Sequence, residues 1–420
     1  MKRLLGSWFF ILIMLAVDFY VFQSLRVVTS SLSPRTRLTI HLFYWSFTAV
    51  ALMLFITISF IGFEKLPQLV RSFIFPIVIG FFIAKIVATL FFLLDDVRRI
   101  FQWGGSKAIS AINGSASSVE GISRSVFLSW LGIGVGGGLF GTLLYGFGNK
   151  YKYRVEKVKL KFENLPSAFK GLKIIQISDI HSGSLEDKNA VEKGVLKVME
   201  HEPDIVFFTG DLVNNVATEM DGFIDVFSNI KAPMGVFSIL GNHDYGDYVK
   251  WPSKAAKEDN LNRLKEIHGE MGWRLLLNEN VTLEKDGESI ALIGIENWGA
   301  KGNFSRYGDL QKAYEGTGSH PFKILLSHDP SHWEAQVCKD YKDIDLMFSG
   351  HTHGMQFGVE LPGFRWSPVQ YMYKHWAGVY RNSNQKLYVN RGFGFLGYPG
   401  RVGIMPEITV FELKKGEKVA

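Results

Sequence analysis

Eight side chains in the C-terminal part of the chain have the chemistry of metal ligands. They are carboxylates, imidazoles and one amide, with no thiolate among them: Asp179, His181, Asp211, Asn242, His243, His328, His351 and His353. Such donors suit pairs of Mn, Fe or Zn ions better than a structural zinc site. Two ions about 3.5–4 Å apart can hold a phosphoryl group for in-line displacement, and water between them is acidified to hydroxide near neutral pH. The set predicts metal-dependent phosphoryl chemistry, with Asp211 well placed to bridge the ions.

Short apolar runs precede these donors and are typical of buried strands. Asp179 and His181 stand two apart in extended chain, so both face one side. The strands expected before the donors cover 173–178, 204–209, 235–240, 322–327 and 345–349. Further strands are expected at 155–162, 281–283, 290–295, 385–390 and 407–413, and helices at 187–200, 218–230 and 258–271. This alternation indicates an α/β sheet, and open sheets of that class bind ligands outside the carboxyl ends of their strands.

The first third of the chain has a different composition. Four apolar segments lie at about 4–22, 38–63, 73–94 and 127–147. Each is near the roughly 20 residues that a helix needs to span a bilayer. Asp18 and Lys85 lie inside two of these segments, and either they pair or Lys85 extends toward the membrane surface. The sequence therefore predicts a transmembrane helical region at 1–149 and a separate domain at 150–420.

Charge is distributed unevenly between these parts. Residues 1–149 hold 12 Lys or Arg and 5 Asp or Glu, a net charge of +7, whereas the remainder carries −1. The basic excess thus flanks membrane segments, and no nucleic-acid partner is expected. Cys338 is the only cysteine, which excludes an intrachain disulfide.

The expected location is the cell membrane, as a multi-pass protein. Basic residues in the connections do not decide the orientation. The stretch Ser123-Arg124-Ser125-Val126-Phe127-Leu128 resembles the twin-arginine export motif, although Ser125 replaces the second arginine. This resemblance favours a catalytic domain on the extracytoplasmic side.

The donor blocks also carry a family resemblance. Asp-x-His, Gly-Asp, Gly-Asn-His-Asp, a lone His after a strand and Gly-His-Thr-His follow one another over 173–413. In this order they resemble the calcineurin-like metallophosphoesterases, and most closely transmembrane proteins with a metallophosphoesterase domain and a Gly-His-Thr-His-Gly-x-Gln block. Met355 stands where that block usually has a second glycine. The resemblance implies a four-layer α/β fold, a β-sandwich flanked by helices, preceded by a bundle of about four transmembrane helices.

The resemblance also implies roles for single residues. Asp179, His181, Asp211 and His353 would hold the first metal ion, and Asp211, Asn242, His328 and His351 the second. His243 would protonate the leaving oxygen or stabilise the transition state, and Asp244 would orient His243. Arg391 and Arg401 would bind substrate phosphate, with a structural salt bridge as the equal alternative.

The expected function is that of a membrane-anchored phosphodiesterase with two divalent ions, Mn, Fe or Zn. It would hydrolyse a phosphodiester or pyrophosphate bond of a lipid-linked substrate by attack of metal-activated hydroxide, with the lipid bilayer as its partner. The aromatic stretch 364–376 would line an acyl-chain groove, contact the membrane or pack as an ordinary loop. Two alternatives stay open: a UDP-2,3-diacylglucosamine-type hydrolase of lipid A synthesis, which requires a cytoplasmic domain, and a receptor or transporter with a vestigial, ligand-binding domain.

Overall fold

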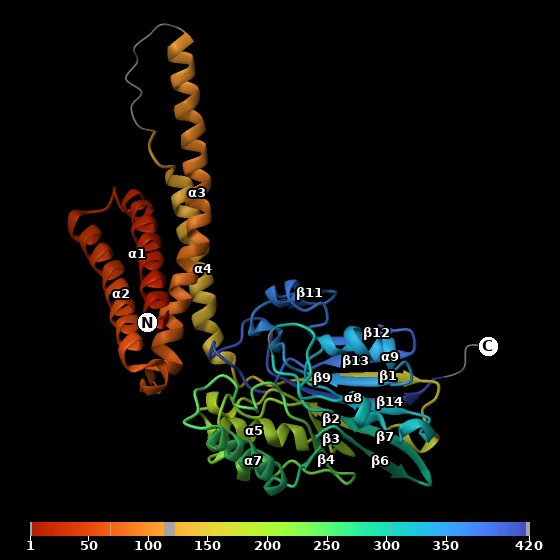
Figure 1. The fold of residues 1–420 in the computed structure, drawn as a ribbon. Helices are drawn as coiled ribbons and strands as arrows, with labels where there is room; N and C mark the ends of the chain where they lie inside the picture. Colours follow the sequence, from red (N-terminus) through yellow and green to blue (C-terminus); the bar gives the residue numbers. More distant parts are fainter. Residues whose placement is uncertain (1, 68, 113–121, 303, 417–420) are drawn as a thin grey trace. The chain divides into compact units, whose positions relative to one another are not determined.

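The computed structural model describes residues 2–67, 69–112, 122–302 and 304–416 (Figure 1). The chain divides into two compact units, Met1–Tyr145 and Gly146–Ala420. Each unit has its own hydrophobic core, so each is described by itself below.

Four helices form the first unit, as predicted: α1 Lys2–Val28, α2 Pro34–Ile61, α3 Phe75–Ile112 and α4 Val126–Gly146. All four are long and apolar enough to cross a membrane. Helix α2 begins where Ser33 accepts a hydrogen bond from the Thr36 amide, with a proline at the next position. Helix α3 continues well beyond the apolar segment 73–94, because ion pairs at i,i+3 spacing support its charged second half.

A buried ion pair connects three of these helices. Lys85 of α3 contacts Asp18 of α1, and the two side chains are 7% and 0% exposed. From α2, the Thr48 hydroxyl donates to Asp18 Oδ2 at 2.7 Å, and the Tyr44 hydroxyl donates to the Asp18 carbonyl at 2.8 Å. Both intramembrane charges are therefore paired inside the first unit.

Two six-stranded sheets form the second unit. The first has the order β1-β14-β2-β3-β4-β5 and the second the order β12-β13-β9-β8-β7-β6. The strands of the first sheet are β1 Arg154–Phe162, β14 Glu407–Lys415, β2 Lys173–Ile177, β3 Ile205–Phe208, β4 Val236–Ser238 and β5 Arg274–Leu275. Those of the second are β12 Gly378–Asn382, β13 Gln385–Val389, β9 Leu346–Ser349, β8 Lys323–Leu326, β7 Glu288–Gly294 and β6 Glu279–Lys285. Within each sheet the central strands are parallel.

The sheets face each other and helices cover their outer faces. Successive residues of β2 show the alternation: Ile174 lies in the core between the sheets, and Ile175 lies in the core under the helices. Helices α5 Lys188–Met199 and α7 Lys254–Glu270 cover the first sheet. The short α8 Leu310–Tyr314 and the turn η8 Trp333–Val337, followed by α9 Cys338–Asp340, cover the second. This confirms the predicted four-layer β-sandwich flanked by helices.

Several segments differ from the sequence-based expectation, among them strands β5 and β12 and helices α8 and α9, for which the sequence predicted no element. The helix predicted at 218–230 is broken into η6 Ala217–Met220 and α6 Ile224–Phe227, with Gly222 between them. A small hairpin, β10 Val359–Leu361 and β11 Phe364–Trp366, was not predicted. Its turn is Pro362-Gly363, and Gly363 has φ 79°, which the third position of a type II turn requires.

Candidate metal centre

The ends of strands β2, β3 and β9 turn into the site through residues in the left-handed backbone conformation. Asp179, His181, Asp211, His351 and His353 have φ of 52°, 48°, 60°, 72° and 51°. Few non-glycine residues adopt this conformation. It ends each strand abruptly and lets donors close in sequence point into one space. The predicted strand-end donors are therefore brought together. The expectation that Asp179 and His181 lie in extended chain is wrong, because β2 ends at Ile177 and both residues are left-handed.

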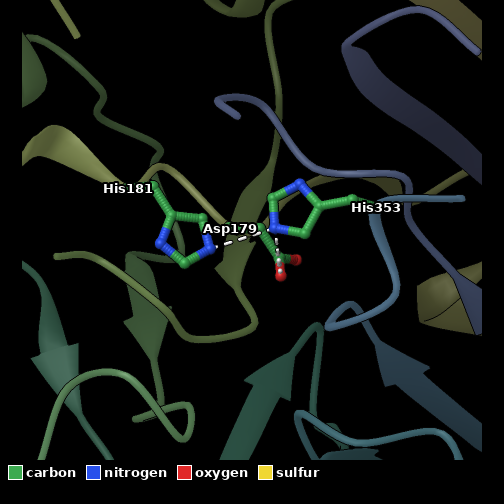
Figure 2. Close-up of side chains that lie close together, drawn as sticks. All are labelled: Asp179, His181 and His353. Carbon is green, nitrogen blue, oxygen red and sulfur yellow. Dashed lines mark hydrogen bonds and ion pairs between the residues drawn. The ribbon is translucent and has the colours of Figure 1, made fainter. Parts of the chain in front are cut away.

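The first group of donors is Asp179, His181 and His353, all buried. The Nε2 atoms of His181 and His353 lie 3.0 Å apart, and His353 Nε2 lies 3.3 Å from Asp179 Oδ1. Figure 2 shows the two imidazole rings turned toward each other with the carboxylate beside them. Two nitrogen atoms and one oxygen atom thus converge on one point.

The second group is Asp211, His328 and His351. His328 Nε2 lies 3.1 Å from Asp211 Oδ2 and 3.3 Å from His351 Nδ1. Asn242 joins this group, because its Oδ1 lies 2.8 Å from His351 Nδ1.

One oxygen atom is common to both groups. Asp211 Oδ2 lies 3.1 Å from His328 Nε2 in the second group and 3.6 Å from His181 Nε2 in the first. The other oxygen, Oδ1, accepts the backbone N–H of His243 at 2.8 Å. Asp211 therefore stands between the two groups with one oxygen available to both.

The charge states of these groups suit cation binding. Burial lowers the pKa of His181 to about 3 and that of His353 well below its usual value, so both imidazoles are neutral, the form that binds metals. Burial raises the pKa of Asp211, but the neighbouring imidazoles of His328 and His243 outweigh it and hold that pKa well below the usual range. Burial lowers the pKa of His328, but the Asp211 carboxylate outweighs this and raises it to about 10. A cation bound here would displace the His328 proton and supply the positive charge in its place.

The hydrogen bonds around His351 further test whether the residues present fit a metal ion. The Tyr373 hydroxyl lies 2.8 Å from His351 Nε2 and 3.4 Å from Asp329 Oδ2. Because a carboxylate only accepts, the single hydroxyl proton goes to Asp329, and Tyr373 oxygen accepts from His351 Nε2–H. Nδ1 of His351 then carries a lone pair that faces Asn242 Oδ1, since the Asn242 amide group donates to Tyr248. Two acceptors 2.8 Å apart fit a cation beside them, so the residues present fit a metal ion.

His243 and Asp244 have different surroundings from those predicted. His243 Nδ1 donates to the Asn214 carbonyl at 2.8 Å. The Asp244 carboxylate instead accepts the backbone N–H groups of Asp211, Leu212, Val213 and Gly241 at 2.8–3.2 Å. The prediction that Asp244 orients His243 is therefore wrong. Asp244 holds the backbone of Asp211 in place, and its own pKa is raised to about 7 by burial and by the nearby Asp211 charge.

For Arg391 and Arg401 the contacts favour the structural alternative over the binding of substrate phosphate. Arg391 is 3% exposed and pairs with Glu407 and with Glu360, the latter at 2.7 Å. Arg401 is fully buried and donates to the carbonyls of His353, Arg391, Gly392 and Gly394. Both guanidinium groups are used inside the protein, and Arg401 fixes the loop that carries His353.

Five of the donors line one cavity of about 460 Å³: His181, Asp211, Asn242, His351 and His353. Apolar side chains form much of its wall: Phe304, Met355, Val369, Met372 and Leu396. Sequence reasoning missed two tyrosines here. Tyr373 was noted only as one of an aromatic run, and Tyr248, which bonds Asn242 and contacts the His243 ring, gave no signal in the sequence.

Comparison with known proteins agrees with this geometry. A family model described as "Calcineurin-like phosphoesterase" matches residues 172–355, and one described as "Probable Calcineurin-like phosphoesterase, transmembrane domain" matches residues 2–149. The chain is similar to "Uncharacterized metallophosphoesterase YkuE" of Bacillus subtilis (strain 168), with 32% identity over 298 residues that cover 66% of this chain and 95% of that protein.

A second relative has the membrane part in its name. "Transmembrane protein with metallophosphoesterase domain" of Danio rerio is 30% identical over 271 residues, which cover 62% of this chain and 57% of that protein. The chain thus spans little more than half the length of this relative. With four membrane-spanning helices in front of the donor-bearing sandwich, the chain belongs to the calcineurin-like metallophosphoesterases, as a membrane protein of that family.

Proposed function

We propose that the protein is a membrane-anchored phosphoesterase with two divalent metal ions, which hydrolyses a phosphodiester or pyrophosphate bond of a lipid-linked substrate. One observation carries the two-ion part: Asp211 Oδ2 lies within reach of both donor groups. Asp179, His181, Asp211 and His353 would hold one ion, and Asp211, Asn242, His328 and His351 the other. Mn, Fe or Zn suits these donors.

Bound ions would supply positive charge to the phosphoryl oxygens and lower the pKa of a bound water. The protein's own residues supply position and a proton. His243 lines the cavity, and its Nδ1–H is fixed on the Asn214 carbonyl. The ring's other nitrogen, Nε2, is thus the atom that would protonate the leaving oxygen, and the ring must carry a proton on both nitrogens to do so.

A lipid-linked substrate is supported by the wall of the cavity. A small phosphoester would leave the exposed apolar side chains of the wall, such as Met355 and Met372, uncovered. An alkyl chain beside the phosphate would cover them, at about 0.8 kcal/mol for each methylene buried.

The test uses the purified full-length protein and two chromogenic phosphodiesters, bis-p-nitrophenyl phosphate and a p-nitrophenyl phosphodiester with a long alkyl chain. We expect hydrolysis of both, loss of activity after chelation, recovery with Mn, Fe or Zn, and about two ions per chain. Hydrolysis that is indifferent to chelators would refute the metal mechanism. Equal kcat/KM for the two esters would refute the lipid part alone.

Replacing Tyr373 by phenylalanine is expected to lower metal affinity by about 10–100-fold, because the His351 imidazole loses the partner that fixes its orientation. The measurement is competition of the metal-free protein with a chelating dye. Tyr371→Phe is the matched control, since this nearby tyrosine is 78% exposed. Unchanged affinity in Tyr373→Phe would show that Tyr373 does not support the metal centre.

A further inference from the structure

Exposed apolar side chains are concentrated in one segment of the second unit. Six of the ten exposed large apolar residues described in Gly146–Ala420 lie within residues 355–372 and are here called the apolar rim: Met355, Val359, Leu361, Phe364, Tyr371 and Met372. Soluble surfaces rarely gather such side chains in one place, and where they do the patch usually contacts a partner or a membrane.

Buried side chains and a hydrogen bond fix the segment that carries the apolar rim. Val369, Tyr373 and Trp376 are buried against Ile404, and the Ser367 hydroxyl donates to the Gly354 carbonyl at 2.8 Å. Strands β10 and β11 pair only with each other in the described structure, so no further strand covers the hairpin. The rim is thus a fixed surface that presents apolar groups outward.

Met355 has a left-handed backbone conformation, which costs free energy for any residue with a β-carbon. Its φ is 54°, and its side chain is 46% exposed. Glycine would relieve this conformation. Met355 and Met372 also line the cavity above the donors. The rim therefore continues directly into the mouth of the candidate active site.

Backbone and side-chain hydrogen bonds connect the end of the last apolar helix to the chain beside the hairpin. The Gly146 carbonyl accepts the Arg401 N–H at 3.0 Å, and the Asn149 amide donates to the Arg401 carbonyl at 3.0 Å. The next residue, Val402, bonds to Gln356 and Gly358 at the base of the hairpin, at 2.8 and 2.9 Å. The chain that leaves the fourth apolar helix therefore enters this unit beside the hairpin.

We propose that the apolar rim inserts into the surface of the membrane that anchors the chain and holds the mouth of the cavity against the lipids. Interfacial apolar groups of this kind lie about 5–10 Å into the boundary between headgroups and acyl chains. A phosphoester in the bilayer could then reach the donors without leaving the membrane plane; this substrate route rests on the proposed function, whereas the docking does not.

The attraction is apolar rather than electrostatic. Two basic side chains beside the rim have acidic partners: Arg365 lies 3.0 Å from Glu360, and Lys374 lies 2.6 Å from Glu334. A third, Lys301, donates to the Met372 carbonyl at 2.6 Å. Docking should therefore persist at high salt, whereas binding through basic side chains to anionic lipid would weaken.

The experiment places an environment-sensitive fluorophore at Leu361→Cys in full-length Cys338→Ser protein. The protein is reconstituted in phosphatidylcholine vesicles that contain lipid with a doxyl quencher in one acyl chain. Leu196→Cys is the matched control, because Leu196 on α5 is 61% exposed and Leu361 is 60% exposed. We expect a blue-shifted emission and several-fold stronger quenching at position 361, at low and high salt. Equal quenching at the two positions, or loss of the difference at high salt, would overturn the proposal.

A second experiment tests the apolar rim with the fluorophore at a position other than 361. Leu361→Asp with Phe364→Asp should abolish the quenching of a fluorophore at Val359→Cys. Neither Leu361 nor Phe364 lines the cavity, so hydrolysis of soluble bis-p-nitrophenyl phosphate should be unchanged. Hydrolysis of the alkyl ester in vesicles should fall. Unchanged quenching would overturn the docking. Strong quenching by a protein that hydrolyses neither ester would refute only the proposed function.

Discussion

Replacing Asp211 by asparagine is expected to lower kcat by about 10³-fold or more, which corresponds to roughly 4 kcal/mol of lost transition-state stabilisation. The amide can keep the Oδ1 contact with the His243 N–H. It replaces Oδ2, the atom between the two donor groups, by an N–H₂ group that cannot bind a cation. The change therefore removes the shared ligand and leaves the local backbone bond intact.

The measurement combines steady-state hydrolysis of bis-p-nitrophenyl phosphate with metal analysis of the same sample. Metal content should fall together with activity. The control is Asp225→Asn, because Asp225 is an exposed carboxylate on α6 that pairs only with Lys188 among the described residues. Full activity in Asp211→Asn would rule out a mechanism with two bridged ions.

Lys85→Met is expected to destabilise the membrane unit by about 3–5 kcal/mol, because it leaves the buried Asp18 carboxylate without its cation. The hydrogen bond from Thr48 stays, but it does not neutralise the charge. The measurement is equilibrium unfolding of the full-length protein in mixed micelles. Adding Asp18→Asn to Lys85→Met should recover most of the loss, since both charges are then absent.

Lys107→Met is the control on the same helix. Lys107 is exposed, and its ammonium group lies over the Trp103 ring at 4.2 Å, a contact worth about 0.5–1 kcal/mol. A loss in Lys85→Met no larger than in this control would mean that the buried pair is not a major support of the helix bundle.

The donors were predictable because their chemistry is local in the sequence. Asp179 and His181 directly follow a β-branched run, and His351 and His353 follow the apolar run Leu346-Met347-Phe348, so strand and ligand appear in one short window. Parallel strands then bring these windows to one edge of the sandwich. The four-layer fold and the four membrane helices were predictable for a similar reason, since periodicity and apolar length are local properties.

The support around the donors was not predictable, because it depends on the path of loops. A carbonyl of any residue type could hold the His243 ring, so nothing in the sequence distinguishes Asn214. Arg391 and Arg401 are typical phosphate ligands by type, but only the folded chain shows their buried acidic and carbonyl partners. Tyr373 meets His351 across a loop of about twenty residues, a contact that no short-range pattern encodes.

The left-handed backbone at the strand ends bears on the idea of a vestigial domain. Asp179, His181, Asp211, His351 and His353 each hold a conformation that costs of order 1 kcal/mol for a residue with a β-carbon. A domain that no longer catalysed a reaction would become more stable if glycine replaced any of these five residues. The chain instead bears the strain at all five at once, which is the expected record of continuing selection for the side chains themselves.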